Sequence, residues 1–497
     1  MWHPFSSPNR LRPRRRGLQS RSPRLEPLEG RVVLSVAFDS VLGVGNDTAS
    51  INSADIAIDS AGNSYITGYF NNTMDFDPTV VRPDGSDVLT SRGYLDPFVA
   101  KYAPDNTLVW VRRMGSEGRD TTGYGTESGD ALAVDAAGNV YVTGDFLGQA
   151  DFGPFTLSSS GSTDVYVAKL DPNGNFLWAR SWGRSATEDF GQAITVDDAG
   201  NVVSAGWNAD ITSNGWIASG FEVRKYSPTG AELWSHRFAN RGGMSSHVDA
   251  DAAGNIYVSG QFSGGLDFNP DPKRTNSVSG SYVVSAGTAN NGYVLKLTAA
   301  GQFAWVAPFV AKTSESAVAV NEFDFDPSGN IVVGGSYGGQ VDFNPNSKVD
   351  YRLPTDSASV DGYVAKLSSA GAFVWATQLD NGRVRSLDVD GSGNIFTSGY
   401  FQGVFSPGFG LPSVTSNGDY HDVFVAELSS SGAVRWVVSF GGPDSEWQAS
   451  IAVDDSGLVY LTGSYSGTVD FDPDPLGTSE LVNPSYVDAF LLKLRRR

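Results

Sequence analysis

The stretch DAAGNVYVTGDF, residues 135–146, decides the fold because close copies of it recur along the chain. It joins two runs of alternating apolar residues through the turn DAAGN, in which Gly138 can adopt the positive φ that other residues resist. An apolar residue at every second position is the pattern of a half-buried β-strand. Further copies begin at residues 59, 251, 326, 390 and 454. The chain is therefore built on a repeated β-hairpin.

The repeated unit extends beyond this hairpin. Its turn glycine and a second glycine six residues later define repeats one to seven, at Gly62/Gly68, Gly138/Gly144, Gly200/Gly206, Gly254/Gly260, Gly329/Gly335, Gly393/Gly399 and Gly457/Gly463. A later apolar run ends in a charged residue, which is Lys101, Lys169, Lys225, Lys296, Lys366, Glu427 or Lys493. A Trp follows nine residues beyond it, at Trp110, Trp178, Trp234, Trp305, Trp375 and Trp436. Fixed offsets inside a variable period indicate rigid modules joined by variable loops.

Each repeat contains four short strand patterns, which in repeat two are ALAVD, NVYVTG, DVYVAKL and FLWARSW. Four-stranded units at this period indicate the blades of a β-propeller. Repeat seven has three strands, and the stretch AFDSVLG (37–43) aligns with LWARSWG (177–183), which places Phe38 at the Trp position. The sequence therefore predicts an all-β fold, a seven-bladed β-propeller over residues 35–497, in which the N-terminal strand completes the last blade and closes the ring.

The unit GNVYVTGxF…DVYVAKLDPNGNFLWARSWG resembles the SBBP bacterial β-propeller repeat, through near-copies that extend over residues 35–497. This resemblance implies the fold. It implies no particular activity, because the family has no common one and propellers serve as enzymes, adhesins and scaffolds alike.

Residues 1–34 differ from the remainder, with eight Arg against Glu26 and Glu29 and no strand or helix period. Within them begins LEPLEGRVVLS, which resembles the LEPR-XLL type of N-terminal segment on large exported proteins of planctomycete-type bacteria and departs from it at Leu28 and the Glu-Gly that follows. The resemblance implies a targeting segment and a secreted or cell-surface protein. The alternative is a disordered basic arm.

The rest of the chain is acidic, with 27 basic and 53 acidic residues after residue 34. Such a balance disfavours nucleic acid and anionic membranes as partners. No apolar run approaches the roughly 20 residues of a membrane helix, and the absence of Cys excludes disulfides and thiolate metal sites. We expect a monomer that binds no nucleic acid and has no membrane span.

Two patterns suggest calcium, the one cofactor for which the sequence offers ligands. The motif DFDP and its variants recur after the second glycine, and two copies offer three oxygen-bearing side chains each: Asp267, Asn269 and Asp271, and Asp470, Asp472 and Asp474. Oxygen ligands two residues apart suit a hard cation. The alternative, which the sequence favours, is an Asx-Pro turn whose Phe plugs the blade.

The second pattern lies two residues before the Asp that begins the repeated turn, which is Asp135 in repeat two and is called the turn Asp below. This residue is small in repeats one, two, three and seven, but it is Asp249, Asp324 and Asp388 in repeats four to six. First strands of propellers line the central channel, so the three carboxylates are expected to form an acidic patch there, suited to a cation or a basic ligand group. The alternative is a hydrated channel whose charges keep their water.

No stretch predicts a catalytic site, and we expect no enzyme. The four histidines, His3, His236, His247 and His421, form no HExxH motif, and neither a G-x-S-x-G elbow nor a P-loop is present. The repeated Trp, Lys and turn Asp residues are assigned to packing between blades, to charge and to turn hydrogen bonds.

Function is expected on the long loops between second and third strands, residues 75–95, 267–291, 342–360 and 470–487. Their aromatic residues are Tyr94, Tyr282, Tyr351 and Tyr486. The favoured hypothesis is a binding or adhesion module for a polysaccharide or an envelope protein. A passive structural surface protein is the alternative, and a polysaccharide lyase or hydrolase is the least supported one.

Overall fold

The computed structural model describes residues 36–46, 48–116, 127–212, 215–239, 242–270, 283–346, 348–355, 360–474 and 476–496. These residues belong to one compact unit, Ser35–Arg497. They form β-strands, turns and irregular links, and none of them is helical. In this part of the chain there is accordingly no helix long and apolar enough to cross a membrane. The basic segment 1–34 lies outside the described residues.

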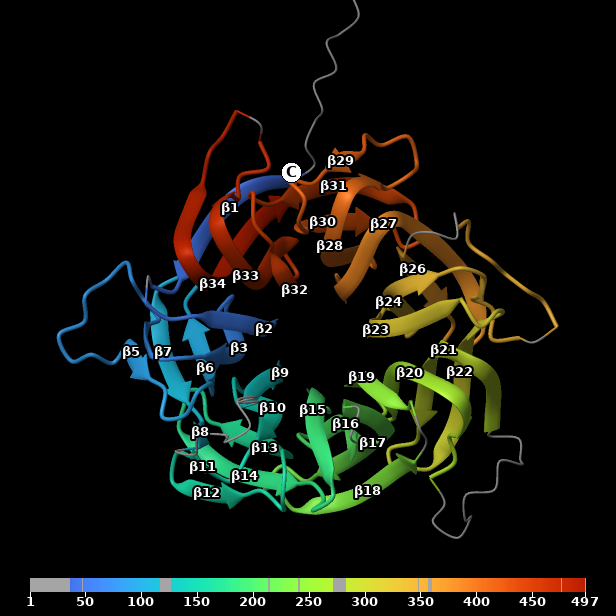
Figure 1. The fold of residues 1–497 in the computed structure, drawn as a ribbon, viewed down its shortest axis with the longest axis horizontal. Coiled ribbons are helices and arrows are strands. Elements are labelled where there is room, and N and C mark those ends of the chain that lie inside the picture. The colour runs from blue at the N-terminus through green and yellow to red at the C-terminus, as the bar shows by residue number, and fades with distance from the viewer. Residues whose placement is uncertain are drawn as a thin grey trace, which may run out of the picture. The chain divides into compact units, whose positions relative to one another are not determined.

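Each repeat folds into an antiparallel sheet whose strands run in chain order from the centre of the unit outwards (Figure 1). The first, innermost strands are β2 (Ile51–Ile58), β9 (Ser128–Val134), β15 (Thr187–Val196), β19 (Met244–Ala250), β23 (Ala317–Phe325), the second half of β27 (Phe373–Val389) and β32 (Trp447–Val453). The second strands are β3 (Ser64–Phe70), β10 (Val140–Phe146), β16 (Val202–Thr212), β20 (Ile256–Asp267), β24 (Ile331–Gly338), β28 (Ile395–Ser406) and β33 (Leu458–Asp470).

The outer half of each sheet holds its third and fourth strands. The third strands are β6 (Asp96–Tyr102), β13 (Asp164–Leu170), β17 (Gly215–Tyr226), β21 (Val283–Leu297), β26 (Asp361–Leu367), β30 (Asp422–Leu428) and β34 (Glu480–Arg496). The fourth strands are β7 (Leu108–Arg113), β14 (Phe176–Trp182), β18 (Glu232–Ala239), β22 (Phe303–Ala311), the first half of β27, β31 (Val434–Phe440) and β1 (Val36–Val44). Because β27 is the outer strand of repeat five and the inner strand of repeat six, these two sheets are continuous.

The repeated hairpin turn folds as its sequence predicts. In repeat two, the N–H of Gly138 donates to the carbonyl of Asp135 at 2.8 Å, and Gly138 has a φ of 78°. The Asp135 carboxylate accepts from the N–H groups of Ala137 (3.0 Å) and Asn139 (2.9 Å). The turn therefore needs an acceptor at its first position and a residue that tolerates positive φ, which explains why Asp and Gly recur.

The strand β1 pairs with the last repeat, as the sequence predicts. It lies antiparallel to β34 in the sheet β1-β34-β33-β32, with Phe38 opposite Leu494. On its other side, the side-chain amide of Asn106, in the outer turn of repeat one, donates to Ser40 Oγ at 3.1 Å. The segment is therefore in contact with both repeat seven and repeat one.

Short strands lie in the links that follow the second strands or join the repeats: β4 (Thr73–Asp75), β5 (Val88–Thr90), β8 (Gly115–Ser116), β11 (Gln149–Phe152), β12 (Phe155–Ser158), β25 (Val341–Asp342) and β29 (Val414–Thr415). The Phe of the DFDP motif lies at the end of the second strand or in the link after it, and its side chain is buried. In repeat two, the Phe152 ring lies 4.8 Å from the Tyr166 ring, which belongs to the third strand. The corresponding plugs are Phe76, Phe268, Phe343, Phe405 and Phe471. The Phe of this motif is therefore a core residue.

In repeats one to five, the repeated Trp joins its repeat to the next. Trp110 Nε1 donates to the carbonyl of Pro172 at 3.0 Å, and Trp178 Nε1 to that of Pro228 at 3.1 Å. The ring lies over a turn glycine of the following repeat, and a Cβ added at Gly174 would stand 2.8 Å from the Trp110 ring. The same contact occurs at Gly230, Gly301, Gly371 and Gly432. The Trp series is thus packing between repeats, as expected.

A Gly174→Ala variant is expected to lose more stability than Gly329→Ala. Both glycines have nearly the same positive φ, 75° and 74°, but no atom lies within 4 Å of a Cβ at Gly329. Each substitution should cost about 1 kcal/mol through its backbone conformation, and overpacking against Trp110 should add about 1–3 kcal/mol at Gly174. Urea unfolding measures both. Equal losses of stability in the two variants would show that a Cβ at Gly174 does not clash with Trp110, and would contradict this prediction.

Candidate functional site

The first strands surround a central cavity of about 590 Å³. Residues of β2, β9, β15, β19, β23, β27 and β32 line it, and Figure 1 shows these strands nearest the centre. Asp249, Asp324 and Asp388 all lie in its wall. The structure therefore brings together the three carboxylates that the sequence placed in one channel.

These carboxylates bind backbone N–H groups of neighbouring strands. Asp324 Oδ2 accepts from the N–H of Val389 at 2.8 Å, and Asp388 Oδ2 accepts from that of Val453 at 2.7 Å. In both cases the acceptor belongs to one repeat and the donor to the next. Asp249 instead accepts a hydrogen bond from Thr195 Oγ1 at 2.8 Å. Asp324 and Asp388 thus have a structural role. They accept hydrogen bonds from N–H groups at the inner edge of a first strand, which has no further strand to pair with.

A second layer, four residues before the turn Asp, repeats this arrangement. Asp55 Oδ2 accepts from the N–H of Leu132 at 2.9 Å, and Glu322 Oε2 accepts from that of Leu387 at 3.1 Å. Sequence reasoning missed this layer, although its residues share one repeat position. A search of every first-strand position for polar residues would have found it.

A β-bulge lies next to this layer in the first strands. The register against the second strand shifts there, for example between Ser53 and Asp55 and between Val320 and Glu322. Bulges re-aim side chains, and the residues passed over by the shift also line the cavity. They include Asp130, Gln192, Ser246, Asn321 and Arg385. The wall is consequently polar.

Burial sets the protonation of these groups. It raises the pKa of Asp249 to about 6 and that of Glu322 to about 8, and repulsion by Asp55 contributes to the second shift. Burial, followed by repulsion from Asp388 and Asp249, holds the pKa of Asp324 well above its usual range. Asp324 and Asp388 hydrogen-bond to each other. The cavity therefore holds protonated carboxyls near neutral pH.

One histidine shares the cavity. Burial lowers the pKa of His247 to about 4, so its ring is neutral at pH 7. His247 Nδ1 lies 3.7 Å from Glu322 Oε1. A protonated Glu322 beside a neutral imidazole forms no ion pair, which leaves the cavity wall with little fixed charge at this point.

The DFDP residues proposed as calcium ligands form successive Asx turns. Asp470 Oδ1 accepts from the N–H of Asp472 at 3.0 Å, and Asp472 Oδ1 accepts from that of Asp474 at 2.9 Å. Asp267 Oδ1 likewise accepts from the N–H of Asn269 at 3.0 Å. These contacts, with the buried Phe, match the turn that the sequence favoured over a calcium loop. Asp271 lies outside the described residues.

Metal binding at these positions stays a prediction. Within the described ranges, no three His, Asp or Glu side chains converge as the ligands of one metal ion would. This holds for the channel carboxylates as well as for the DFDP loops.

In repeats one, three, four and five, the repeated Lys forms an ion pair with the turn Asp of its own repeat. In repeat three, Lys225 Nζ lies 2.8 Å from Asp197 Oδ2, and in repeat five Lys366 Nζ lies 2.6 Å from Asp326 Oδ2. All four side chains are largely buried. In these repeats the Lys therefore neutralises a turn carboxylate, which is a structural role, whereas Lys493 donates to the carbonyl of Pro104 in repeat one.

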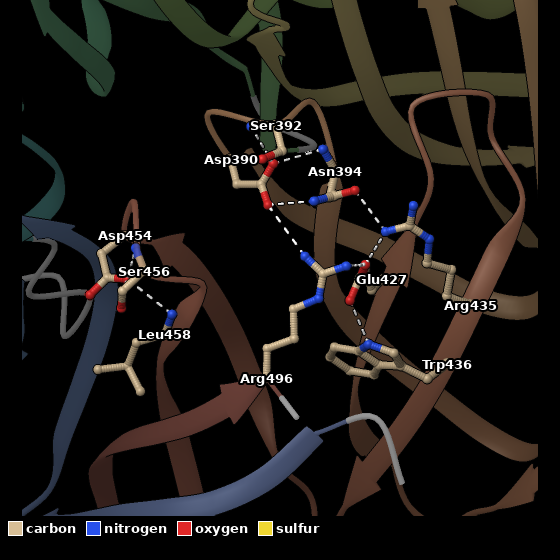
Figure 2. Close-up of polar contacts among 10 residues, drawn as sticks. All are labelled: Asp390, Ser392, Asn394, Glu427, Arg435, Trp436, Asp454, Ser456, Leu458 and Arg496. Carbon is tan, nitrogen blue, oxygen red and sulfur yellow. Dashed lines mark hydrogen bonds and ion pairs between the residues drawn. The ribbon is translucent and has the colours of Figure 1, made fainter. Parts of the chain in front are cut away.

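Repeat six replaces this Lys by Glu427 and obtains its cations elsewhere (Figure 2). Arg496, on the third strand of repeat seven (β34), lies 2.8 Å from Glu427 Oε1 and 3.7 Å from Asp390 Oδ2. Arg435 also contacts Glu427, and Trp436 Nε1 donates to Glu427 Oε2 at 2.7 Å. The departure at Glu427 therefore joins repeat six to repeat seven.

An aromatic cluster lies where repeats six and seven meet. It is at the end of the unit at which the first strands begin and the second strands connect to the third strands. We call this end the long-loop face. The His421 ring lies 5.1 Å from the Tyr400 ring and 5.2 Å from the Trp447 ring. The Arg383 guanidinium lies 5.8 Å from the centre of the Tyr400 ring. Trp447 is 43% exposed. We call these four residues the aromatic rim.

The aromatic residues that the sequence singled out are more scattered. Tyr94 and Tyr486 are exposed. Tyr351 packs on Phe373, with ring centres 4.5 Å apart, and Tyr282 lies outside the described residues. Sequence reasoning missed the aromatic rim because its members share no repeat position. Three of them lie on β27, β28 and β32, and His421 lies in the link before β30.

Comparisons with known proteins agree with this architecture. The sheets follow one another around a shared cavity, each with its first strand innermost. The chain is a β-propeller repeat protein. An uncharacterised WD repeat-containing protein of Acanthamoeba polyphaga mimivirus is 22% identical over 490 residues, which cover 79% of this chain and 34% of that protein. The propeller thus spans about a third of the length of this curated relative. No family model matches the chain.

Solved structures resemble the propeller at low identity. The Dos1 propeller is 8% identical with a TM-score of 0.43, and the match covers 92% of this chain and 94% of that one. Polysaccharide lyase Uly1 is 9% identical with a TM-score of 0.43, over 93% and 100% of the two chains. Virginiamycin B lyase from Staphylococcus aureus is 8% identical with a TM-score of 0.38, over 91% and 99%.

Stability of the propeller is expected to fall as the pH rises from about 4 to about 8, where the raised carboxyls lose protons that the folded state holds more tightly than the unfolded chain. An Asp324→Asn variant should flatten this fall, because the amide replaces a proton-dependent donor to Asp388. Melting temperatures from pH 4 to 8 measure the effect. Asp198→Asn, on an exposed turn, is the control and should keep the parent slope. Parallel profiles for the parent and Asp324→Asn would contradict this assignment.

Proposed function

We propose that the protein is an exported or cell-surface β-propeller that binds a neutral polysaccharide through its long-loop face and catalyses no reaction. Its repeats form seven four-stranded blades, and the pairing of β1 with β34 closes the ring. The resemblance of residues 25–35 to export-associated segments supports the location. The closed ring supplies a rigid scaffold, on which exposed links can carry a binding surface.

The aromatic rim is the observation that carries this proposal. Trp447 begins β32, whose later residues line the cavity, so the rim lies at the entrance to the channel. Arg383 and Tyr400 face each other across the first and second strands of repeat six. Half-exposed aromatic rings held by such contacts lose little conformational freedom when a ligand stacks on them.

The chemistry of the surroundings suits a sugar chain without charge. Sugar rings stack on aromatic faces through their C–H groups, and their hydroxyls hydrogen-bond to polar side chains such as Gln192, Asn321 and Ser246 in the channel wall. A formal net charge of −20 disfavours polyanionic glycans. A neutral polysaccharide avoids this repulsion.

A polysaccharide-active enzyme is the second candidate. The observation that favours it is the raised pKa of Glu322 and Asp249 in the cavity, because general acids need a proton at neutral pH. The same pKa shifts follow from the burial of these carboxyls in the wall of the cavity, so we place this function second.

Binding is tested by affinity electrophoresis and calorimetry against neutral glucans and mannans, with uronate-containing and sulfated polysaccharides for comparison. We expect binding to at least one neutral polysaccharide. Trp447→Ala should weaken it about tenfold or more, which corresponds to about 1.4 kcal/mol. Tyr94→Ala, an exposed aromatic residue away from the rim, is the matched control and should bind like the parent.

The outcomes separate the hypotheses. Loss of binding in Tyr94→Ala alone would move the site to the outer loops. No binding to any polysaccharide would contradict the proposal and favour a passive structural protein. Release of reducing ends or unsaturated sugars during the assay would favour the enzyme.

A further inference from the structure

Two buried carboxyls adjoin the aromatic rim, each next in sequence to one of its members. Asp422 is the first residue of β30, and Glu446 directly precedes β32; each is 1% exposed. Asp422 Oδ2 accepts from the N–H of Asn417 at 2.9 Å, and Glu446 Oε2 accepts from that of Gly442 at 3.3 Å. One oxygen of each carboxyl therefore accepts a hydrogen bond from the backbone.

The other two oxygens are buried without a hydrogen-bond donor. Asp422 Oδ1 and Glu446 Oε1 have no partner in the described part of the chain. A buried acceptor left without a donor costs about 1–3 kcal/mol, and more when it is charged, so these oxygens need a partner from outside the chain.

The first junction of the propeller, between repeats one and two, supplies such a partner internally. There the acidic pair is Asp96 and Glu127, which are also buried. Arg113 lies 3.1 Å from Asp96, and the N–H of Ser116 donates to Glu127 at 3.0 Å. The same acidic pair is therefore neutralised by a cation of the chain.

The junction between repeats six and seven lacks that cation. Counting from the repeated Trp, Ser439 stands at the position of Arg113, and Gly442 stands at the position of Ser116. The neighbouring Arg383 points to the Tyr400 ring, and Arg435 contacts Glu427. The acidic pair is therefore present at both junctions, but only the first of the two has an arginine at this position beside it.

We propose that a calcium ion binds between Asp422 and Glu446 and replaces the missing arginine. Calcium prefers carboxylate and carbonyl oxygens and completes its shell with water. A site with two carboxylates should be weak, with a Kd of about 10⁻⁴ to 10⁻³ M, the range of extracellular calcium modules. This site differs from the two DFDP loops proposed as calcium ligands, whose described Asp side chains are only half-buried and therefore keep contact with water.

Calcium at this site would also order the aromatic rim. Asp422 follows His421 and Glu446 precedes Trp447 in the chain, and the N–H of Glu446 donates to the carbonyl of His421 at 3.0 Å. Polysaccharide affinity should therefore rise with calcium, a consequence that rests on the proposed function. The calcium site itself does not depend on that function.

The test is isothermal calcium titration of the full-length, chelator-treated protein at pH 7.5, with no polysaccharide present. We expect about one calcium per chain in the stated affinity range. The double variant Asp422→Asn/Glu446→Gln should lose this binding, and Asp470→Asn/Asp472→Asn should keep it. No binding by the parent, or binding that persists in the first double variant, overturns the proposal.

A second variant guards against misfolding of the first. Ser439→Arg restores the residue type that neutralises the first junction, so it should abolish calcium binding and raise the melting temperature in chelator. Unchanged calcium affinity in a folded Ser439→Arg protein would overturn the proposal as well. Because no glycan takes part, a failed calcium site and a failed polysaccharide site are distinguishable.

Discussion

The inner edge of every first strand is the constraint on which this propeller depends. That edge faces a shared cavity, where no further strand can satisfy its backbone N–H groups, and a buried unpaired N–H costs about 1–3 kcal/mol. Side chains two and four residues before the turn Asp accept these bonds across the boundary between repeats, as Asp324 does for Val389 and Glu322 for Leu387. The polarity of the channel and its raised pKa values follow from this construction. A perturbed carboxyl here is therefore weak evidence of catalysis.

Outside the channel, other contacts join each sheet to the next. A Trp of one repeat lies over the turn glycine of the next, and the Phe of each DFDP motif fills the core beneath the long loops. Where repeat six departs from the pattern at Glu427, Arg496 of repeat seven supplies the charge. Where the last junction lacks an arginine, we infer that calcium does so. Departures from the repeat are thus compensated at the boundary between repeats six and seven, and the aromatic rim lies at that boundary.

The periodic part of this architecture could be predicted from the sequence. Hairpins, four-strand units and the pairing of β1 with β34 all follow from fixed offsets and the alignment of Phe38 with the Trp positions. The grouping of Asp249, Asp324 and Asp388 followed from their shared repeat position. What escaped prediction includes the rim, whose members share no repeat position, and the bulges, which leave no mark on residue type. The acidic pair at Asp422 and Glu446 was missed although its positions recur at Asp96 and Glu127. The DFDP motif was ambiguous for a different reason, because Asx turns and calcium loops use the same side chains.

Closure of the ring through β1 is the central claim, and a designed disulfide tests it most directly in a chain that has no cysteine. Leu42 and Leu491 are opposite each other in the β1–β34 register, and both are buried. Opposed residues of antiparallel strands have Cα atoms about 4.5–5.5 Å apart, within disulfide reach. The account predicts that the Leu42→Cys/Leu491→Cys variant forms an intramolecular disulfide on oxidative refolding. The Leu42→Cys/Leu492→Cys variant should form none, because the side chain of residue 492 faces the other side of the sheet. Free thiols in the first variant, or equal oxidation of both, would contradict it.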